Sequence, residues 1–396
     1  MKSIPIFIFC GFIFVLTGCD ACQEKKSVLT PIVKKQTLDN QEDSDRGERY
    51  EDYGHRWGFI DTTGKLLIPF QYEDAGGFSE GLAAVRVKDA WGYINKKAEI
   101  VIAPTFKGAW DFKGGMARVL TVENKVGYIN KKGQWAITPD YENASDFKEG
   151  LAVVEGEKGF CYINTDGKKT IATLFEQASP LDKGFAKVRL NDKVGLINKA
   201  GNFVIKPKYQ TIAIQKNGFI RFDSEAKSGV CNNRGEVIIT PKNVKILYYR
   251  PNAILVATAK MPKLIDKKGK VLIDSLLEDI SPLADTLWAV KKDGKIGIFS
   301  NRGNEVLPCQ FTQLYQFSEQ KIAFQSGDRW GFMDLQLNVI TEPQYKLVWS
   351  FNNQFARVVG YDGFGYVNRK GVEIIAPQYQ DAKDFSEGMA RVMKRM

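Results

Sequence analysis

The sequence predicts an all-β protein built from about ten tandem repeats of 34 residues. Part of the unit occurs in closely similar form at Arg56–Asp61, Ala90–Asn95 and Arg329–Asp334, each time around a Trp-Gly pair. The glycine position of this unit recurs at 58, 92, 127, 161, 195, 229, 263, 297, 331 and 365. So constant a period marks a supersecondary unit that buries its apolar side against its neighbours.

The second unit shows the elements that we expect in every repeat. Its β-branched and aromatic residues form short runs separated by turn signals, as antiparallel strands do. We expect strands at 82–87, 91–94 and 99–102, turns at 88–90 and 95–98, and an aromatic linker from 106 to 112. Pro104 is expected to end the third strand, because proline has no N–H to donate to a sheet.

Five columns of the repeat support this interpretation. Asn or Asp stands three residues after the glycine position in nine of ten units, and Gly stands six residues after it in eight. This pattern is typical of a hairpin loop in which a type I turn precedes a residue with positive φ. The aromatic columns of Tyr72 and Phe78 are interpreted as core, in preference to a stacking platform for sugars or bases. The glycine position itself indicates close backbone approach inside a strand.

The N-terminus has the pattern of an export signal. Lys2 precedes an almost wholly apolar run over 4–16, which is shorter than the roughly 20 residues of a membrane span. Leu16-Thr17-Gly18-Cys19 resembles the bacterial lipobox, whose cysteine becomes the acylated first residue of the mature protein. We therefore expect a signal peptide over 1–18, lipidation at Cys19 and a place in the bacterial cell envelope, at the outer rather than the inner membrane. An ordinary signal peptide with an incidental cysteine is the alternative.

Charge and composition separate a tether from the repeats. Residues 19–55 are expected to form a flexible tether, since they hold nine acidic and six basic residues, a net of −3, with no apolar period. The whole chain carries +10 and Lys2 adds one charge, so residues 56–396 carry about +12. This charge follows the repeat and favours acidic partners. His55 is the only histidine and no CxxC pair lies in the repeats, so we expect neither a metal nor a cofactor.

The repeat resembles the bacterial WG repeat. The resemblance rests on Arg56–Asp61, the turn glycine, the proline and the closing segments Phe78–Val85 and Phe385–Val392, and it covers residues 56–396. It implies a repeat domain over that range but no catalytic residues. The units at 229 and 263 depart most, with Ser228 and Pro262 in the tryptophan column and Lys263 at the glycine position. We interpret this as drift, and a specialised site is the alternative.

Two architectures are possible for the array, one open and one closed. We favour an open, solenoid-like superhelix of about ten β-meander units, capped at its exposed ends. The alternative is a closed, propeller-like ring, in which the Trp-Gly strand of the first unit pairs with the strand at 390–392 of the last. Ten blades would be unusually many, and 34 residues would make each of them unusually small.

The turn after the Trp-Gly strand supplies the candidate binding residues. Basic residues stand there in seven units, namely Lys96, Lys97, Lys131, Lys132, Lys199, Arg234, Lys267, Lys268, Arg302, Arg369 and Lys370. Stacked repeats would align them into a basic ridge that can follow an anionic polymer, with an affinity that falls as salt rises. The alternative is that turns only need solvated residues.

We expect a non-catalytic, lipid-anchored binding or scaffold module without catalytic residues. Its expected partners are the membrane, through the lipid, and an envelope protein, an anionic glycan or a lipid headgroup; we expect no nucleic acid and a monomeric protein. The alternative is an envelope glycan hydrolase that uses a pair of carboxylates. Acidic residues that recur in one turn column are interpreted as part of the repeat instead: Glu80, Glu149, Glu319 and Glu387.

Overall fold

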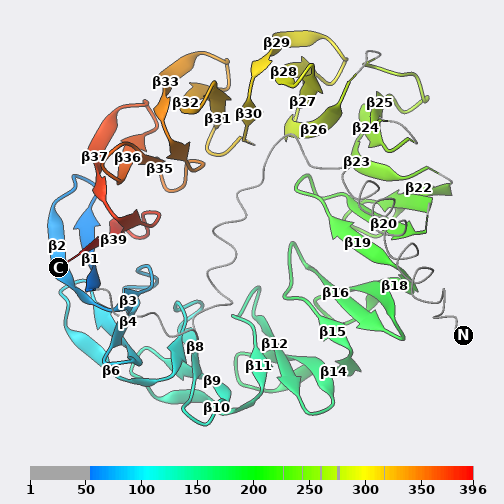
Figure 1. The fold of residues 1–396 in the computed structure, drawn as a ribbon. Coiled ribbons are helices and arrows are strands. Elements are labelled where there is room, and N and C mark those ends of the chain that lie inside the picture. The colour runs from blue at the N-terminus through cyan, green and yellow to red at the C-terminus, as the bar shows by residue number, and fades with distance from the viewer. Residues whose placement is uncertain are drawn as a thin grey trace, which may run out of the picture.

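The computed structural model describes residues 54–395 apart from 226, 243, 259–260, 274–276 and 316. Within this part of the chain, 39 strands form ten small antiparallel sheets, which are arranged in a ring (Figure 1). The fold is therefore a ten-bladed β-propeller, and the predicted all-β repeat architecture is confirmed. No helix among the described residues is long and apolar enough to cross a membrane.

We number the sheets as blades 1 to 10 along the ring. Blade 1 combines both ends of the chain: β38 (Asp381–Ala382), β39 (Met389–Arg395), β1 (His55–Asp61) and β2 (Leu66–Tyr72). Blades 2 to 4 contain β3 (Asp74–Ala75), β4 (Leu82–Val87), β5 (Ala90–Asn95) and β6 (Ile100–Phe106); β7 (Gly108–Ala109), β8 (Met116–Leu120), β9 (Val126–Asn130) and β10 (Trp135–Tyr141); β11 (Asn143–Ala144), β12 (Leu151–Gly156), β13 (Gly159–Asn164) and β14 (Lys169–Phe175).

The remaining blades follow in chain order. Blades 5 to 7 contain β15 (Gln177–Ala178), β16 (Phe185–Leu190), β17 (Lys193–Asn198) and β18 (Phe203–Tyr209); β19 (Thr211–Ile214), β20 (Ile220–Ser224), β21 (Lys227–Cys231) and β22 (Val237–Lys242); β23 (Ile246–Arg250), β24 (Ala253–Val256) and β25 (Lys263–Ile265). Blades 8 to 10 contain β26 (Asp279–Ala284), β27 (Leu287–Lys292), β28 (Lys295–Ser300) and β29 (Glu305–Phe311); β30 (Gln313–Leu314), β31 (Lys321–Ser326), β32 (Arg329–Asp334) and β33 (Val339–Tyr345); β34 (Leu347–Val348), β35 (Phe355–Val359), β36 (Phe364–Asn368) and β37 (Glu373–Tyr379).

The ring is closed, so the favoured open superhelix is wrong and the propeller alternative is correct. Strand β1 pairs with β39 in antiparallel register from His55 opposite Arg395 to Asp61 opposite Met389. The two strands lie side by side at the left of Figure 1. Each end of the chain supplies half a blade with an unpaired edge, and pairing the halves removes both edges. The structural blade is therefore offset by half a unit from the sequence repeat.

Blade 2 shows where the local predictions hold and where they fail. Strand β4 covers the predicted 82–87, but β6 runs through Pro104 to Phe106 instead of ending at the proline. Trp91 pairs with Phe106 and Tyr93 with Ile102, so the outer strand bulges opposite Gly92. Proline is tolerated there because a bulged edge strand needs no donor at that position. The expected linker also contains a short strand, β7, which begins blade 3.

The glycine position is explained by this bulge. A Cβ atom on Gly92 would lie 2.5 Å from the carbonyl oxygen of Ile102 and 2.7 Å from the nitrogen of Pro104. The predicted close backbone approach is therefore confirmed. Lys263 takes this position in blade 7, where the described residues form three strands and no fourth strand crosses it.

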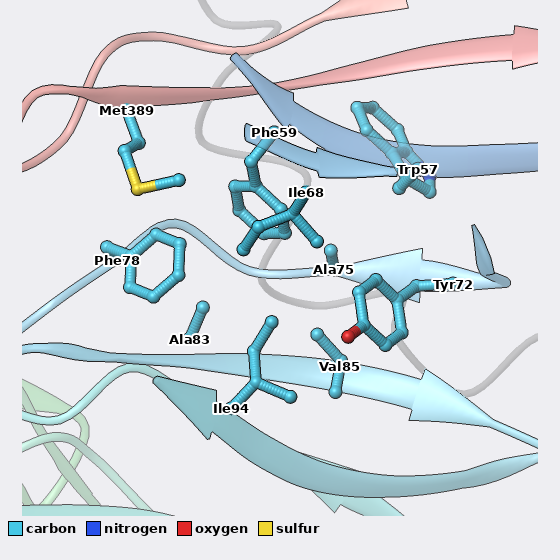
Figure 2. Close-up of a cluster of buried hydrophobic side chains, with 10 residues drawn as sticks. All are labelled: Trp57, Phe59, Ile68, Tyr72, Ala75, Phe78, Ala83, Val85, Ile94 and Met389. Carbon is cyan, nitrogen blue, oxygen red and sulfur yellow. The ribbon is translucent and has the colours of Figure 1, made fainter. Parts of the chain in front are cut away.

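The core lies between neighbouring blades. Figure 2 shows the layer between blades 1 and 2, where Phe59 and Ile68 from one sheet face Phe78 and Val85 from the next. The rings of Phe59 and Phe78 meet edge to face with centroids 5.0 Å apart. Phe78 is almost fully buried, so the prediction that its column is core is confirmed. Because a blade has two such faces, it is stable only with a neighbour on each side.

Hydrogen bonds join the blades as well. The hydroxyl of Tyr93 donates to the carbonyl oxygen of Trp110 at 2.7 Å, and that of Tyr366 donates to the carbonyl of Lys383 at 2.6 Å. Burial raises the pKa of Tyr366, so the hydroxyl stays protonated and keeps its donor role. Packing and polar contacts therefore both hold adjacent blades at one spacing.

Candidate binding surface

Each end of the blades makes one face of the ring. In blade 2 the inner loop 76–81 and the turn 96–99 lie at the same end of the strands, because β4 begins where the antiparallel β5 ends. We call this end, and its equivalents in the other blades, the turn face. The opposite end carries the hairpin turn Lys88-Asp89 and the connections between blades, and we call it the connector face. The eleven predicted basic residues all stand on the turn face and are all exposed.

The turns hold these residues at the rim in the predicted way. The side-chain oxygen of Asn95 accepts hydrogen bonds from the backbone N–H of Lys97 at 2.9 Å and of Glu99 at 3.0 Å. Ala98 takes a φ of 65°, the conformation that Gly supplies in most other units, such as Gly133 at 76°. The predicted loop with an Asx start and positive φ at its end is confirmed. Its apex places Lys96 and Lys97 at the exposed end of the blade.

The first basic residue of several turns is tied to the preceding blade. Lys131 pairs with Glu80 at 3.1 Å and Lys96 with Glu387 at 3.2 Å, in each case across a blade boundary. Glu80 also accepts a hydrogen bond from the backbone N–H of Gly115 in the next blade, at 3.0 Å. Arg369 and Glu319 form the same contact more loosely, at 4.0 Å. The recurring glutamates thus tie blades together, which supports their interpretation as part of the repeat.

Glu80 is held in its charged form by this environment. Partial burial alone would raise its pKa, but the hydrogen bonds from Lys131 and the backbone of Gly115 outweigh it, so the pKa lies below the ordinary value. The carboxylate is therefore ionised at neutral pH and neutralises part of the predicted ridge. Lys96, Lys131 and Arg369 are accordingly less available to a ligand than the sequence implies.

Eight ridge residues remain unpaired. Among the described residues no ion pair involves Lys97, Lys132, Lys199, Arg234, Lys267, Lys268, Arg302 or Lys370. Four of the eight belong to three consecutive blades, 5 to 7. In blade 5 the position of Glu80 is taken by Lys183, which donates to the backbone carbonyl of Lys216 instead of accepting from the next blade.

The net charge is concentrated in the same three blades. Residues 177–276 hold 19 Lys and Arg against seven Asp and Glu, a net of +12. Residues 54–176 and 277–395 together hold 30 of each sign, a net of zero. The expectation that the charge follows the repeat around the array is therefore wrong: basic turns recur, but outside residues 177–276 the acidic residues of the ring equal the basic ones in number. We call residues 177–276 the basic sector; it lies at the right of Figure 1.

Other reactive groups are few in the described part of the chain. Cys161 and Cys231 are free and buried, as expected of small core residues. Burial raises the pKa of Cys231 to about 11, so its thiol is protonated at neutral pH. No group of three His, Cys, Asp or Glu residues in the described ranges is placed to hold a metal ion. Cys19, the expected signal peptide and the tether up to residue 53 lie outside the described residues.

Comparison with known protein families identifies the repeat. The family described as WG containing repeat matches residues 57–89, 91–125, 127–156, 162–193, 195–224, 264–295, 296–330, 330–359 and 364–395. The gap from 225 to 263 lies inside the basic sector. No curated protein matches the chain significantly.

Several solved structures are similar in outline. A eukaryotic initiation factor is 13% identical, with 74% of this chain and 95% of that chain covered and a TM-score of 0.46. The designed protein Ika8 is 9% identical, with 78% and 98% covered and a TM-score of 0.35. BamB from Moraxella catarrhalis is 11% identical, with 86% and 97% covered and a TM-score of 0.32. Similarity at this level carries no information about the function of this chain.

Proposed function

The chain belongs to the WG-containing repeat family, and from this premise we propose that it is a non-catalytic binding or scaffold module of the bacterial cell envelope. Cys19 carries the lipid that anchors it, residues 1–18 are removed on export, and residues 20–55 space the ring from the bilayer. The partner is an acidic envelope component, a glycan, a lipid headgroup or a protein, and nucleic acid is not expected outside the cytoplasm.

The observation that carries this proposal is a rigid ring with cationic turns on one face. The blades are joined by apolar layers and by contacts such as that between Glu80 and Lys131, so the turns are held at set positions. Lys199, Arg234 and Lys268 stand exposed at this face. A fixed display of charge loses little freedom when it meets an anionic partner, and this favours binding.

A capture experiment tests the binding role. Residues 24–396 keep every described strand, including both halves of blade 1. This chain, immobilised, is mixed with detergent-solubilised envelope, half of which has been digested with protease. Capture that survives digestion and weakens with salt identifies an anionic glycan or lipid, and capture lost on digestion identifies a protein partner. If neither half yields saturable capture, the binding role is wrong.

Metabolic labelling with a radioactive fatty acid tests the anchor. The full-length protein is expected to take up label and to fractionate with membranes, whereas Cys19→Ala is expected to take up none. Equal labelling of the two proteins would contradict lipidation at Cys19. Separation of inner and outer membranes then tests the proposed outer-membrane location.

A further inference from the structure

We propose that the basic sector, formed by blades 5 to 7, is the binding site for a long anionic glycan chain. This inference rests on the proposed binding role and adds the place on the ring and the class of ligand. The sector carries the whole net charge of the ring, +12 within residues 177–276, while the charges of the other seven blades sum to zero. Net charge on one side of a molecule directs an oppositely charged partner to that side.

The positive charge of the sector is not consumed by its own acids. Of its seven acidic residues, Asp223 pairs with Arg221 at 3.1 Å, and Asp182 pairs with Lys148 of blade 4 at 3.0 Å. The side chain of Glu236 accepts a hydrogen bond from Asn232 within its own turn. The basic residues therefore outnumber the acidic ones by 12, and few carboxylates of the sector are left to pair with its exposed lysines. These cations are open to an external anion.

The charge lies on several sides of the sector instead of covering one flat face. On the turn face the exposed residues are Lys183, Lys199, Arg234, Lys267, Lys268 and Lys270. The outer strand β18 exposes Lys206 and Lys208, and the connector face exposes Lys193, Lys227 and Lys245. A planar bilayer can contact only one of these sides at a time. A flexible polymer can follow the charge from the turn face over the rim.

The kind of cation also favours a polymer. Fifteen of the 19 basic residues are lysines, and most of the arginines are engaged within the ring. Arg250 is buried and donates to Asn301 at 3.0 Å, and Arg221 donates to the carbonyl of Leu247 at 2.8 Å. Exposed lysines are hydrated point charges without the fork geometry that selects one phosphate or carboxylate. They suit repeated anionic groups whose individual positions vary.

The sequence diverges in the same place. The family match is interrupted at 225–263, within the sector, and Lys183 stands at the position that is glutamate in Glu80, Glu149, Glu319 and Glu387. Drift in the repeat pattern gives no reason for acids to disappear while lysines accumulate. A specialised site accounts for both changes together, so on this proposal the divergent units are such a site.

Two matched variants of residues 24–396 test the proposal. One carries Lys199→Gln, Arg234→Gln, Lys267→Gln and Lys268→Gln within the sector. The other carries Lys97→Gln, Lys132→Gln, Arg302→Gln and Lys370→Gln at equivalent turns outside it. Both remove four charges from exposed, unpaired turn positions, so the ring falls from +12 to +8 in each case. Binding is measured by calorimetry against polygalacturonate, neutral dextran, poly-glutamate and phosphatidylglycerol vesicles, after thermal melting has shown that both variants fold.

The expected result is salt-sensitive binding of polygalacturonate that is about tenfold weaker in the sector variant and less than twofold weaker in the other. Equal weakening in both variants would mean that net charge alone acts, and would overturn the sector as the site. Binding of vesicles or poly-glutamate in preference to polygalacturonate would overturn the assignment of a glycan as the ligand. If the wild-type chain captures envelope material and the sector variant captures it equally well, the proposed function stands and the sector is not its site.

Discussion

The basic sector and the neutral blades solve the same packing problem in different ways. In the neutral part, buried Arg357 of blade 10 pairs with Asp384 of blade 1 at 2.7 Å and donates to the carbonyl of Ala382. In the sector, Arg250 crosses to the next blade without a direct ion pair: it donates to Asn301 and stacks on Trp288, 4.4 Å from the ring centroid. Blade contacts can therefore be kept without such a pair. Cations elsewhere in the sector are then left for other partners.

The two regions also differ in how tightly the strands cross. The glycine column leaves no room for a side chain in blade 2, whereas blade 7 carries Lys263 at that position. Ordinary blades have a fourth strand that bulges over the glycine, and the described part of blade 7 has three strands. Four-stranded blade 4 accommodates Cys161 at this position, whereas in the described part of blade 7 no strand lies across Lys263.

The largest effect is expected from breaking this strand crossing. Gly92→Val places a side chain against the backbone of Ile102 and Pro104, and should lower the free energy of unfolding by about 4 kcal/mol. Lys263→Gly in blade 7 should change it by less than about 1 kcal/mol. Urea denaturation followed by tryptophan fluorescence measures both. Similar losses for the two variants would show that blade 7 has the same constraint.

The second effect comes from the ion pair between blades 10 and 1. Arg357→Ala leaves Asp384 with a hydrogen bond from Asn352 but without its cation, and should cost about 3 kcal/mol. Lys267→Ala, which removes an exposed and unpaired cation, should change stability by no more than about 0.5 kcal/mol. Thermal unfolding distinguishes the two. A cost for Lys267→Ala comparable to that of Arg357→Ala would contradict the difference between paired and unpaired cations.

A smaller effect should depend on pH. Because the pKa of Glu80 is lowered in the folded ring, its contribution is complete above the pKa of the unfolded chain and is lost as pH falls through the folded pKa. Glu80→Gln should therefore be less stable than the wild type by up to about 1 kcal/mol at pH 7, and the difference should shrink below about pH 4.5. Exposed Glu157→Gln on the connector face is the control. A difference that is constant from pH 7 to pH 3 would rule out the charged contact.

The smallest effect tests self-repulsion in the basic sector. Removing four cations there should raise stability by about 0.5 kcal/mol at low salt, and the gain should vanish in high salt because screening removes the repulsion. The matched variant outside the sector should show a smaller gain. Melting temperatures at two salt concentrations measure this. A gain that persists in high salt would point to a contact rather than to repulsion.

Much of the blade was predictable because its signals are local. The Asx residue, the positive-φ position and the three longer strands of blade 2 follow from hydrogen-bonding chemistry and period, and the structure confirms them. The prediction that Pro104 ends the third strand failed because its place in a bulge depends on the neighbouring strand. The short strand β7 has two residues and gives no periodic signal.

The binding surface was predicted only in part for the same reason. That the turn residues are exposed and basic can be read directly from the repeat. Which of them are neutralised depends on contacts across blade boundaries, such as that of Lys96 with Glu387, 291 residues apart in the chain. The sector could have been located from the sequence by counting the net charge of each repeat separately, instead of over the whole array.

The sequence by itself determined the unit, its turns, its core columns and the charge on each repeat, because these depend on residues within about one period of each other. The tertiary structure decided that the array closes, since closure depends on the angle between blades summed over ten of them. It also decided which cations remain unpaired. Both outcomes are set by contacts between units, where small differences in geometry accumulate and residues distant in the chain meet.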